Sequence, residues 1–449
     1  MSADGVSLYP FVRSGPSGAL EIERAEGAWL YRKDGGRILD AAGGAIVANI
    51  GHGRREVAEA VAEATAREGY VVPTFATPSR LRLHARLRER WLPDGLEHIC
   101  LTSGGSESVD TALRLVRQHF VARGEPERWK VIGRDVSYHG ATLSTLAVGG
   151  HTKRRAPMGP LLVDFPKAPA CVCAHCPFER SYPACGVACA DAVERVIERE
   201  GPGTVAAVIA EPVVGSSGGA LVPPPEYWPR LREICDRHGV LLVADEVMTG
   251  FGRTGRRFAV DHWGVVPDVL VGGKGLAGGY APLGGVYAHE RVLAPLAERG
   301  EDVMFYTFAG HPGACAAADK VLEILEREDL VARAASLGAA LRERLRKLED
   351  HPHVLEVRGL GLMIGIELVR DRERRLPFAR EDEFTRRVVA AGLGEGVFFY
   401  PCGVEPVRDA VMLGPPFCIG DEEIERIAST LERAIDSAAR YTLSGRRGG

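Results

Sequence analysis

Residues 240–275 decide the fold, and they read VLLVADEVMTGFGRTGRRFAVDHWGVVPDVLVGGKG. The apolar run at 240–244 ends in two carboxylates, the first of which is Asp245, and the apolar run at 269–272 ends close to Lys274. Short, continuous apolar runs are typical of strands that are buried in a parallel sheet. The stretch therefore predicts two neighbouring strands, each with a charged side chain at its carboxyl end.

Lysine is rare in this chain, so each lysine can be judged separately. The lysines are Lys33, Lys130, Lys153, Lys167, Lys274, Lys320 and Lys347. Six of them lie in polar, turn-like or helical stretches that are typical of a solvated surface, whereas Lys274 lies in an apolar run flanked by glycines. Burial of an ammonium group is costly unless the group is paired or used in chemistry. Lys274 is therefore the first candidate for a functional residue.

Strand and helix patterns alternate through the middle of the chain. Strand-like runs lie at residues 98–102, 130–132, 205–210, 240–244, 269–272 and 285–288. Apolar residues with helical spacing recur between these runs, at residues 109–120, 192–197 and 228–234. Such alternation predicts an α/β fold with a mainly parallel sheet flanked by helices.

The pattern changes from about residue 321. A long arginine-rich helix (330–348), strands at 354–358, 363–368 and 397–400, and a final helix (421–439) follow. Residues 1–60 hold short strands and turns without enough apolar residues for a core of their own. A chain of 449 residues favours two domains. We therefore predict a large domain (61–320) and a smaller α+β domain formed by both termini (1–60 and 321–449).

A glycine-rich loop precedes one of the expected helices. Residues 102–107 read TSGGSE and join the strand at 98–102 to a helix expected over 106–120. A helix start offers free N–H groups and a positive dipole end, and small residues let a phosphate approach the backbone. An ordinary N-capped helix after a glycine turn fits the same residues. This loop alone leaves both interpretations open.

Asp245 and Lys274 together favour one cofactor. In open α/β sheets, ligands bind beyond the carboxyl ends of the strands. A strand-end acid that keeps a pyridine nitrogen protonated, beside a buried lysine that forms a Schiff base, suits pyridoxal 5'-phosphate (PLP). Residues 248–255 (MTGFGRTG) are too rich in glycine for a helix and are expected to form a constrained active-site loop.

A series of ordered motifs along nearly the whole chain resembles the class III (ω-) aminotransferases of PLP fold type I. The motifs are DAAGGAIVANIGHG (40–53), TSGGSESVDTALRLVR (102–117), SYHG (137–140), EPV (211–213), LVADEVMTGFGRTG (242–255), GGKGLAGGYAPLGG (272–285) and YTFAGHP (306–312). The order of these motifs along the chain is specific to this family, although the glycine-rich loop alone is not. The resemblance implies a PLP-dependent aminotransferase.

The resemblance implies a role for each matching residue around the cofactor ring. Lys274 is similar to the Schiff-base lysine of the family, which also carries the proton. Asp245 is implied to pair with the pyridinium nitrogen. Tyr138 is implied to stack on one face of the ring and Val247 to pack against the other, although each residue taken singly also fits a core position.

Further roles are implied at the phosphate and at the ring hydroxyl. Gly105 and Ser106 are implied to bind the phosphate, as is Thr307 from the neighbouring subunit. Glu211 is implied to support the hydrogen bonds near the ring hydroxyl, and His139 belongs to the ring-stacking motif and is counted among the cofactor-binding residues. A site shared in this way implies a homodimer, with a tetramer as the alternative.

Departures from the family pattern bear on the substrate. Members that prefer 2-oxoglutarate often carry a glutamate shortly after the EPV motif, which gates an arginine that binds carboxylates; residues 215–219 (GSSGG) stand there instead. Many members use a mobile arginine near a C-terminal PP motif, and Arg408 is our candidate. The predicted pocket residues are Ile46, Phe75, Tyr138 and Ala141. Their largely apolar character favours an ω-amino acid or amine as donor, and we expect a 2-oxo acid, pyruvate, as acceptor.

Two alternatives stay open. Racemases, aminomutases and decarboxylases share this scaffold and the first chemical steps. A non-catalytic metal-binding protein is suggested by five cysteines and His175 between residues 171 and 189, because zinc prefers such ligands. The cysteine spacing is not a standard zinc pattern, and residues 166–183 are expected to form a long surface loop, so we predict no metal site.

Overall composition excludes several classes of partner. A formal net charge of -4 gives no reason to expect nucleic acid or an acidic membrane surface. No apolar stretch approaches the roughly 20 residues that a membrane span needs, and residues 1–14 lack the pattern of a secretion signal. We expect a cytoplasmic enzyme that acts on small molecules.

Overall fold

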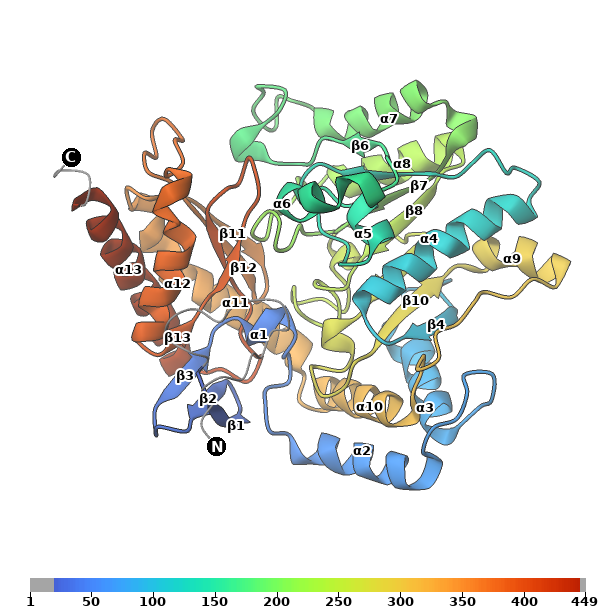
Figure 1. The fold of residues 1–449 in the computed structure, drawn as a ribbon, viewed down its shortest axis with the longest axis horizontal. Helices are drawn as coiled ribbons and strands as arrows, with labels where there is room; N and C mark the ends of the chain where they lie inside the picture. Colours follow the sequence, from blue (N-terminus) through green and yellow to red (C-terminus); the bar gives the residue numbers. More distant parts are fainter. Residues whose placement is uncertain (1–19, 445–449) are drawn as a thin grey trace.

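The computed structural model describes residues 20–444, and a seven-stranded sheet with flanking helices forms its larger part (Figure 1). The strands are β4 (His98–Thr102), β5 (Lys130–Arg134), β6 (Lys167–Ala168), β7 (Val205–Ala210), β8 (Leu241–Asp245), β9 (Val269–Gly272) and β10 (Gly284–Ala288). Their order is β4-β10-β9-β8-β7-β5-β6, and only β10 runs antiparallel to its neighbours. The predicted α/β class with a mainly parallel sheet is confirmed.

Helices bury both faces of this sheet, which explains the continuous apolar runs. The helices are α4 (Gly105–Ala122), α7 (Ala188–Glu200), α8 (Tyr227–His238) and α9 (Glu290–Arg299). Successive side chains of a strand point to opposite faces. In β8, Leu242 joins the core that contains Trp228 of α8, whereas Val243 joins the core that contains Val109 of α4. Both faces therefore require apolar residues.

The smaller part contains two four-stranded sheets and three long helices. One sheet has the order β11-β12-β15-β14 and the other the order β1-β2-β3-β13. The strands are β1 (Ile22–Glu26), β2 (Trp29–Arg32), β3 (Arg37–Asp40), β11 (Val354–Leu360), β12 (Met363–Leu368), β13 (Val397–Phe398), β14 (Tyr400–Cys402) and β15 (Ala410–Leu413). The helices are α11 (Leu330–Leu345), α12 (Phe384–Gly394) and α13 (Asp421–Ser444). Because β13 pairs with β3, strands from both ends of the described chain share one sheet.

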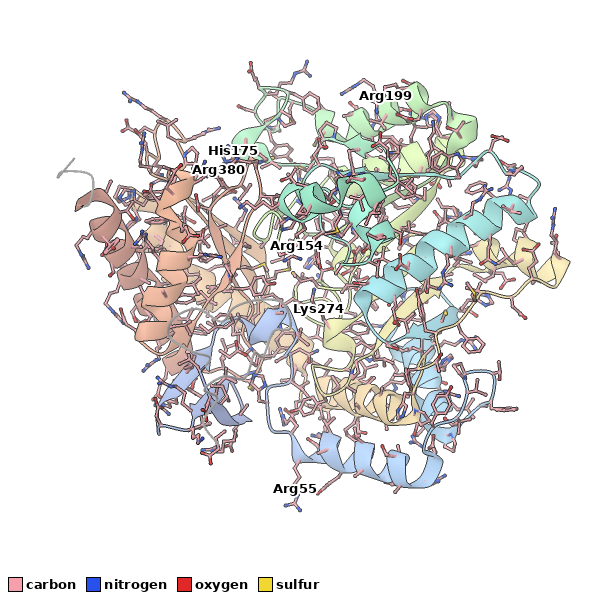
Figure 2. All side chains as sticks on the ribbon, in the orientation of Figure 1. Arg55, Arg154, His175, Arg199, Lys274 and Arg380 are labelled. Carbon is pink, nitrogen blue, oxygen red and sulfur yellow. The ribbon has the colours of Figure 1, made fainter. Side chains whose placement is uncertain are left out.

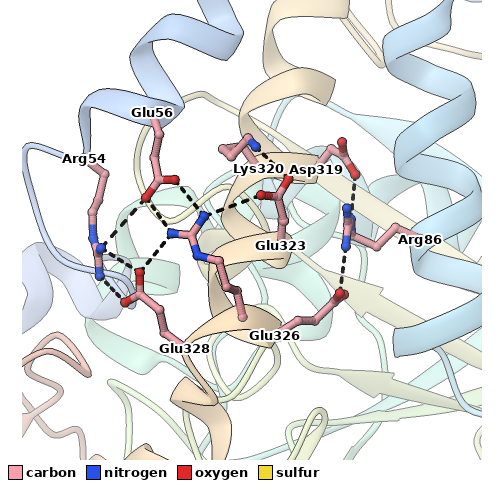
Figure 3. A network of polar contacts seen from close by, with 9 residues as sticks. Arg54, Glu56, Arg86, Asp319, Lys320, Glu323, Glu326 and Glu328 are labelled. Carbon is pink, nitrogen blue, oxygen red and sulfur yellow. Dashed lines mark hydrogen bonds and ion pairs between the residues drawn. The ribbon is translucent and has the colours of Figure 1, made fainter.

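Ion pairs join the helices that connect these parts (Figure 3). The connecting helices are α2 (Arg55–Glu68), α3 (Pro78–Arg86) and α10 (Pro312–Arg327), and the remaining short helices are α1 (Gly43–Ile46), α5 (Leu143–Val148) and α6 (Thr152–Arg155). Arg54, just before α2, donates to both carboxylate oxygens of Glu328 at 2.9 and 2.7 Å. Arg86 of α3 donates to Asp319 of α10 at 2.6 Å. Paired arginine–carboxylate bonds fix orientation as well as distance, so α2 and α3 are held against α10.

The structure departs from the predicted elements in a few places. The domain boundaries predicted at 60/61 and 320/321 fall inside α2 and α10, and the division into domains stays a prediction. The single strand predicted at 397–400 is wrong, because β13 and β14 pair in different sheets. Residues 166–183, predicted as a loop, include β6, which pairs with β5.

Two sequence predictions concern membranes and secretion. Within residues 20–444, no helix is long and apolar enough to cross a membrane. The segment inspected for a secretion signal, residues 1–14, lies outside the described residues.

Candidate active site

A cavity of about 280 Å³ lies at the carboxyl edge of the large sheet. The predicted residues that line it are Gly105, Ser106, Tyr138, His139, Glu211, Asp245, Val247 and Lys274. They follow β4, β5, β7, β8 and β9, which all run in the same direction. Residues that follow such strands meet at one edge of the sheet. The parallel strands therefore bring segments that are far apart in the sequence together at this cavity.

Lys274 lies in this cavity directly after β9, near the centre of the molecule (Figure 2). Its φ of +41° falls in the left-handed region, which is uncommon for a residue with a side chain and occurs preferentially at functional sites. Burial lowers the pKa of the Lys274 amine, the charges of Asp245 and Glu211 oppose this shift, and the charge of Arg154 adds to it. A lowered pKa favours a neutral amine, which is both a base and a nucleophile.

The carboxylate of Asp245 is buried and fixed in position. Its Oδ2 lies 2.7 Å from Nδ1 of His139, and its Oδ1 accepts a hydrogen bond of 3.1 Å from the N–H of Val247. The ring of His139 is fully buried, and its Nε2 has no hydrogen-bond partner among the described residues. An ionised carboxylate has about four lone-pair sites, so Asp245 can also accept a hydrogen bond from a cationic N–H in the cavity.

Glu211 ties two loops of the cavity together. Its Oε2 accepts a hydrogen bond of 3.2 Å from the N–H of Tyr138, and its Oε1 accepts one of 3.0 Å from the N–H of Gly215. Burial raises the pKa of Glu211, and the charges of His139 and Arg134 limit that rise. The carboxylate therefore positions Tyr138 relative to the loop that follows β7.

The start of α4 is built for close approach to an anion. No side chain caps this helix in the described chain, which argues against the N-capped alternative and leaves the N–H groups of the first turn available. A Cβ on Gly105 would lie 2.7 Å from Cγ1 of Val247, and a Cβ on Gly140 would lie 2.7 Å from Oγ of Ser106. Glycine at both positions keeps the helix start open.

Five predicted residues do not line this cavity in the single chain: Thr307, Phe75, Ile46, Ala141 and Arg408. Thr307 is exposed, and its carbonyl oxygen accepts a hydrogen bond of 3.1 Å from the Tyr70 hydroxyl. Phe75 is 65% exposed, so the described residues leave most of it uncovered. Ile46 is buried in a core cluster instead, and its neighbour Ala45 lines the cavity.

The two remaining predicted substrate residues lie next to the cavity. Ala141 is exposed, and its N–H donates to Oγ of Ser106 at 3.1 Å. Arg408 lines a second cavity of about 600 Å³, which shares Arg154 and Ser216 with the first.

Some residues that line the first cavity were not predicted. The main ones are Arg154, Val213, Ser216, Met248, Thr249 and Tyr400. Met248 and Thr249 belong to the glycine-rich loop that we expected beside the site. No sequence pattern pointed to Arg154 or Tyr400 as site residues. Arg154 lies in a basic run, and Tyr400 lies in a short strand of the smaller part.

The cysteine-rich segment contributes no side chain to this cavity. His175 Nε2 contacts the carboxylate of Glu367, and of the nearby thiols Cys171 is buried while Cys173 is exposed. Over residues 20–444, no group of three or more His, Cys, Asp or Glu side chains is arranged to hold a metal ion.

Comparisons with known proteins identify the family of this chain. Residues 12–435 match the profile of the family described as "Aminotransferase class-III". A probable aminotransferase of Mycobacterium tuberculosis is 39% identical over 94% of this chain and 91% of its own length. A putrescine–pyruvate aminotransferase of Pseudomonas aeruginosa is 34% identical over 95% and 92% of the two chains. A thermostable (S)-enantioselective omega-transaminase of Thermomicrobium roseum, with 36% identity, superposes over 97% of both chains with a TM-score of 0.92.

Proposed function

The chain belongs to the class III aminotransferase family, and on this premise we propose that it moves an amino group from an ω-amino acid or simple amine to pyruvate. As a member of this family it is a PLP-dependent enzyme with an amine donor and a 2-oxo acid acceptor. Relatives that are named as aminotransferases and match over nearly the whole chain favour amino transfer over the racemase, aminomutase and decarboxylase alternatives. The observation that carries the proposal is that Lys274 and Asp245 line one cavity.

The residues of this cavity fit PLP. Gly105 and Ser106 would hold the phosphate, because the uncapped start of α4 offers N–H groups and the glycine leaves room. Tyr138 and Val247 would contact the two faces of the ring. Thr307 would complete the phosphate site from a second subunit.

Polar residues of the cavity complete the fit. Asp245 would pair with the ring nitrogen, and His139 orients that carboxylate through the 2.7 Å contact. Glu211 would support the hydrogen bonds on the hydroxyl side of the ring. Lys274 would carry the covalent link.

Bound PLP supplies an electron sink that stabilises negative charge on the donor carbon next to the nitrogen. Lys274 would accept the proton from that carbon and deliver it to the aldehyde carbon of the cofactor, because burial lowers the pKa of its amine and favours the neutral form. Asp245 would keep the ring nitrogen of bound PLP protonated, because a fixed negative charge stabilises a neighbouring cation strongly where water is excluded.

We further propose a homodimer that works in the cytoplasm. All ten cysteines are free, which supports a reducing compartment. Exposure of Thr307 and Phe75 on the single chain supports a partner that places equivalent residues at each site.

Complementation tests the dimer. A Lys274→Ala chain mixed with a Thr307→Ala chain should form heterodimers in which one site carries both lesions and the other carries neither. We expect the mixture to exceed the activity of either parent, as measured after refolding the chains together. If each chain kept Thr307 at its own site, mixing would restore nothing. A monomer that stays active at every dilution would contradict the dimer.

Acceptor choice is the second test. In its own cavity Arg408 lies 3.4 Å from Asp409 and 3.9 Å from Glu405, so its charge stays paired when no carboxylate substrate is bound. A mobile arginine of this kind avoids leaving a buried charge unpaired when an apolar amine occupies the site. The relative from P. aeruginosa, a putrescine–pyruvate aminotransferase, supports pyruvate as acceptor.

We expect pyruvate to be at least as good an acceptor as 2-oxoglutarate in a donor panel with the keto product measured. Arg408→Ala should weaken carboxylate substrates roughly tenfold, which corresponds to one lost charged hydrogen bond, and should spare amines that lack a carboxylate. Equal losses for both classes, or strict dependence on 2-oxoglutarate, would contradict this assignment.

A further inference from the structure

The second cavity is strongly basic. It lies between the smaller part and the loop that holds α6. Its charged lining residues are Lys153, Arg154, Arg380, Arg386, Arg408, Glu383 and Asp409. Positive side chains outnumber negative ones, so the cavity attracts anions.

Most of its arginines are already paired with a carboxylate. Arg380 donates to Glu405 at 3.1 Å, Arg386 donates to Glu383 at 2.8 Å, and Arg408 contacts Asp409. Arg154, by contrast, forms no ion pair with any residue between 20 and 444. It is also the only arginine, among the residues described, that lines the cavity containing Lys274.

Aromatic contacts hold the guanidinium of Arg154 where the two cavities meet. Its central carbon lies 4.3 Å from the ring centroid of Tyr138. Tyr400 lines the same cavity, and the positive charge of Arg154 opposes the rise that burial causes in the pKa of its hydroxyl. Arginine stacks well on aromatic rings and still presents its N–H fork to an anion. Figure 2 places Arg154 and Lys274 together in the middle of the molecule, between its larger and smaller parts.

The positive charge of Arg154 acts on the amine of Lys274, which is the reacting group of the site. The positive charge of Arg154 contributes to the lowered pKa of the Lys274 amine, so the two side chains are within electrostatic range. A substrate whose amino group reaches Lys274 therefore has a cation within reach of its other end.

We propose that Arg154 is a specificity-determining residue that binds the carboxylate of ω-amino acid and 2-oxo acid substrates where the two cavities join. The proposal rests on the proposed function, because it takes Lys274 as the reacting end of the site. Arginine suits the task because its planar fork matches the two oxygens of a carboxylate. Arg154 already lines both cavities, so it would receive the carboxylate there. Arg408, which would have to leave its acidic neighbours to reach the first cavity, would add a second contact.

Arg154 also accommodates substrates without a carboxylate. Arg154 is exposed to solvent and stacked on Tyr138. A bound amine that lacks a carboxylate would therefore leave no buried, unpaired charge on Arg154. The same site can then accept simple amines and ω-amino acids, and the carboxylate adds affinity without being required.

The first half-reaction with donor alone tests this role, using the PLP-loaded enzyme and following cofactor absorbance against donor concentration. For 4-aminobutanoate, Arg154→Gln should raise the half-saturating concentration roughly 10- to 100-fold, the range for one lost hydrogen-bonded charge pair. For butylamine it should change little. Arg154→Lys should restore part of the loss. Arg55→Gln, the same change on a side chain that is 90% exposed and lies far away on α2 (Figure 2), is the matched control and should behave as wild type.

Calorimetric binding of butanoate and of neutral butanamide gives a readout that is independent of turnover. Butanoate should bind the wild type and lose affinity roughly tenfold or more in Arg154→Gln, whereas butanamide should bind both proteins alike. If no amine is converted but butanoate binding depends on Arg154, the proposed function fails, whereas the assignment of Arg154 as a carboxylate-binding residue stands. If donors react yet Arg154→Gln affects 4-aminobutanoate and butylamine equally, or leaves butanoate binding unchanged, the inference is overturned.

Discussion

Lys274→Ala is expected to abolish measurable amino transfer, with a loss of at least ~10⁴-fold, because the variant loses the proton carrier of the site. The fold should survive. Lys274 lies at the edge of a cavity and is only half-buried, and alanine inherits the same positive φ without filling new space. Steady-state rates with an amine and pyruvate measure the loss, and circular dichroism and thermal melting check the fold.

Covalent mapping tests the same residue chemically. Borohydride reduction of the PLP-loaded enzyme, followed by peptide mapping, should place the pyridoxyl group on Lys274. Lys167 is the matched control, because burial also lowers the pKa of its amine, to about 8, yet it donates to the carbonyl oxygens of Ala147 and Phe165 outside the cavity. Lys167→Ala should leave the label in place. A label on any lysine other than Lys274 would overturn the assignment.

The large sheet could be predicted because its strands are buried on both faces. Such strands read as unbroken apolar runs, and the predicted bounds of β7 and β9, whose residues are all buried, agree with the structure. The smaller part was harder. Phe399 is fully buried and separates β13 from β14. The apolar residues around it do not reveal that these two strands belong to different sheets.

Part of the candidate site could be predicted for a topological reason. Asp245 and Lys274 follow parallel strands that neighbour each other, so their convergence follows from the sheet. In the proposed dimer, Thr307 and Phe75 would reach a site only through a second chain, which no local pattern specifies. Arg154 was missed because the run TKRR on the four-residue α6 is locally the same as a solvated basic stretch. Its charge reaches the cavity through the stacking of Arg154 on Tyr138, which only the folded chain reveals.

Asp245 is adjacent to a second acid that provides a matched control for its role. Glu246 is also buried, and burial raises its pKa to about 7. Its carboxylate, however, accepts hydrogen bonds from Thr249 and from the N–H of Val260, and it does not line the cavity. Glu246→Gln therefore removes a buried carboxylate without removing a charge from the cavity, and it should leave the rate of proton abstraction close to that of the wild type.

Asp245→Asn is expected to keep PLP bound but to slow proton abstraction from the donor by about a thousandfold or more, as for a fixed charge lost from a site shielded from water. The amide keeps the size of the side chain, so His139 and Val247 still contact it. Protonation of Lys274 does not explain the loss, because the charge of Asp245 raises the pKa of that amine and its removal leaves the amine more neutral. Loss of deuterium from the carbon that bears the amino group of a labelled donor, measured in a single turnover, reports the step directly. An Asn variant that exchanges deuterium at the wild-type rate would show that Asp245 is not the partner of the ring nitrogen.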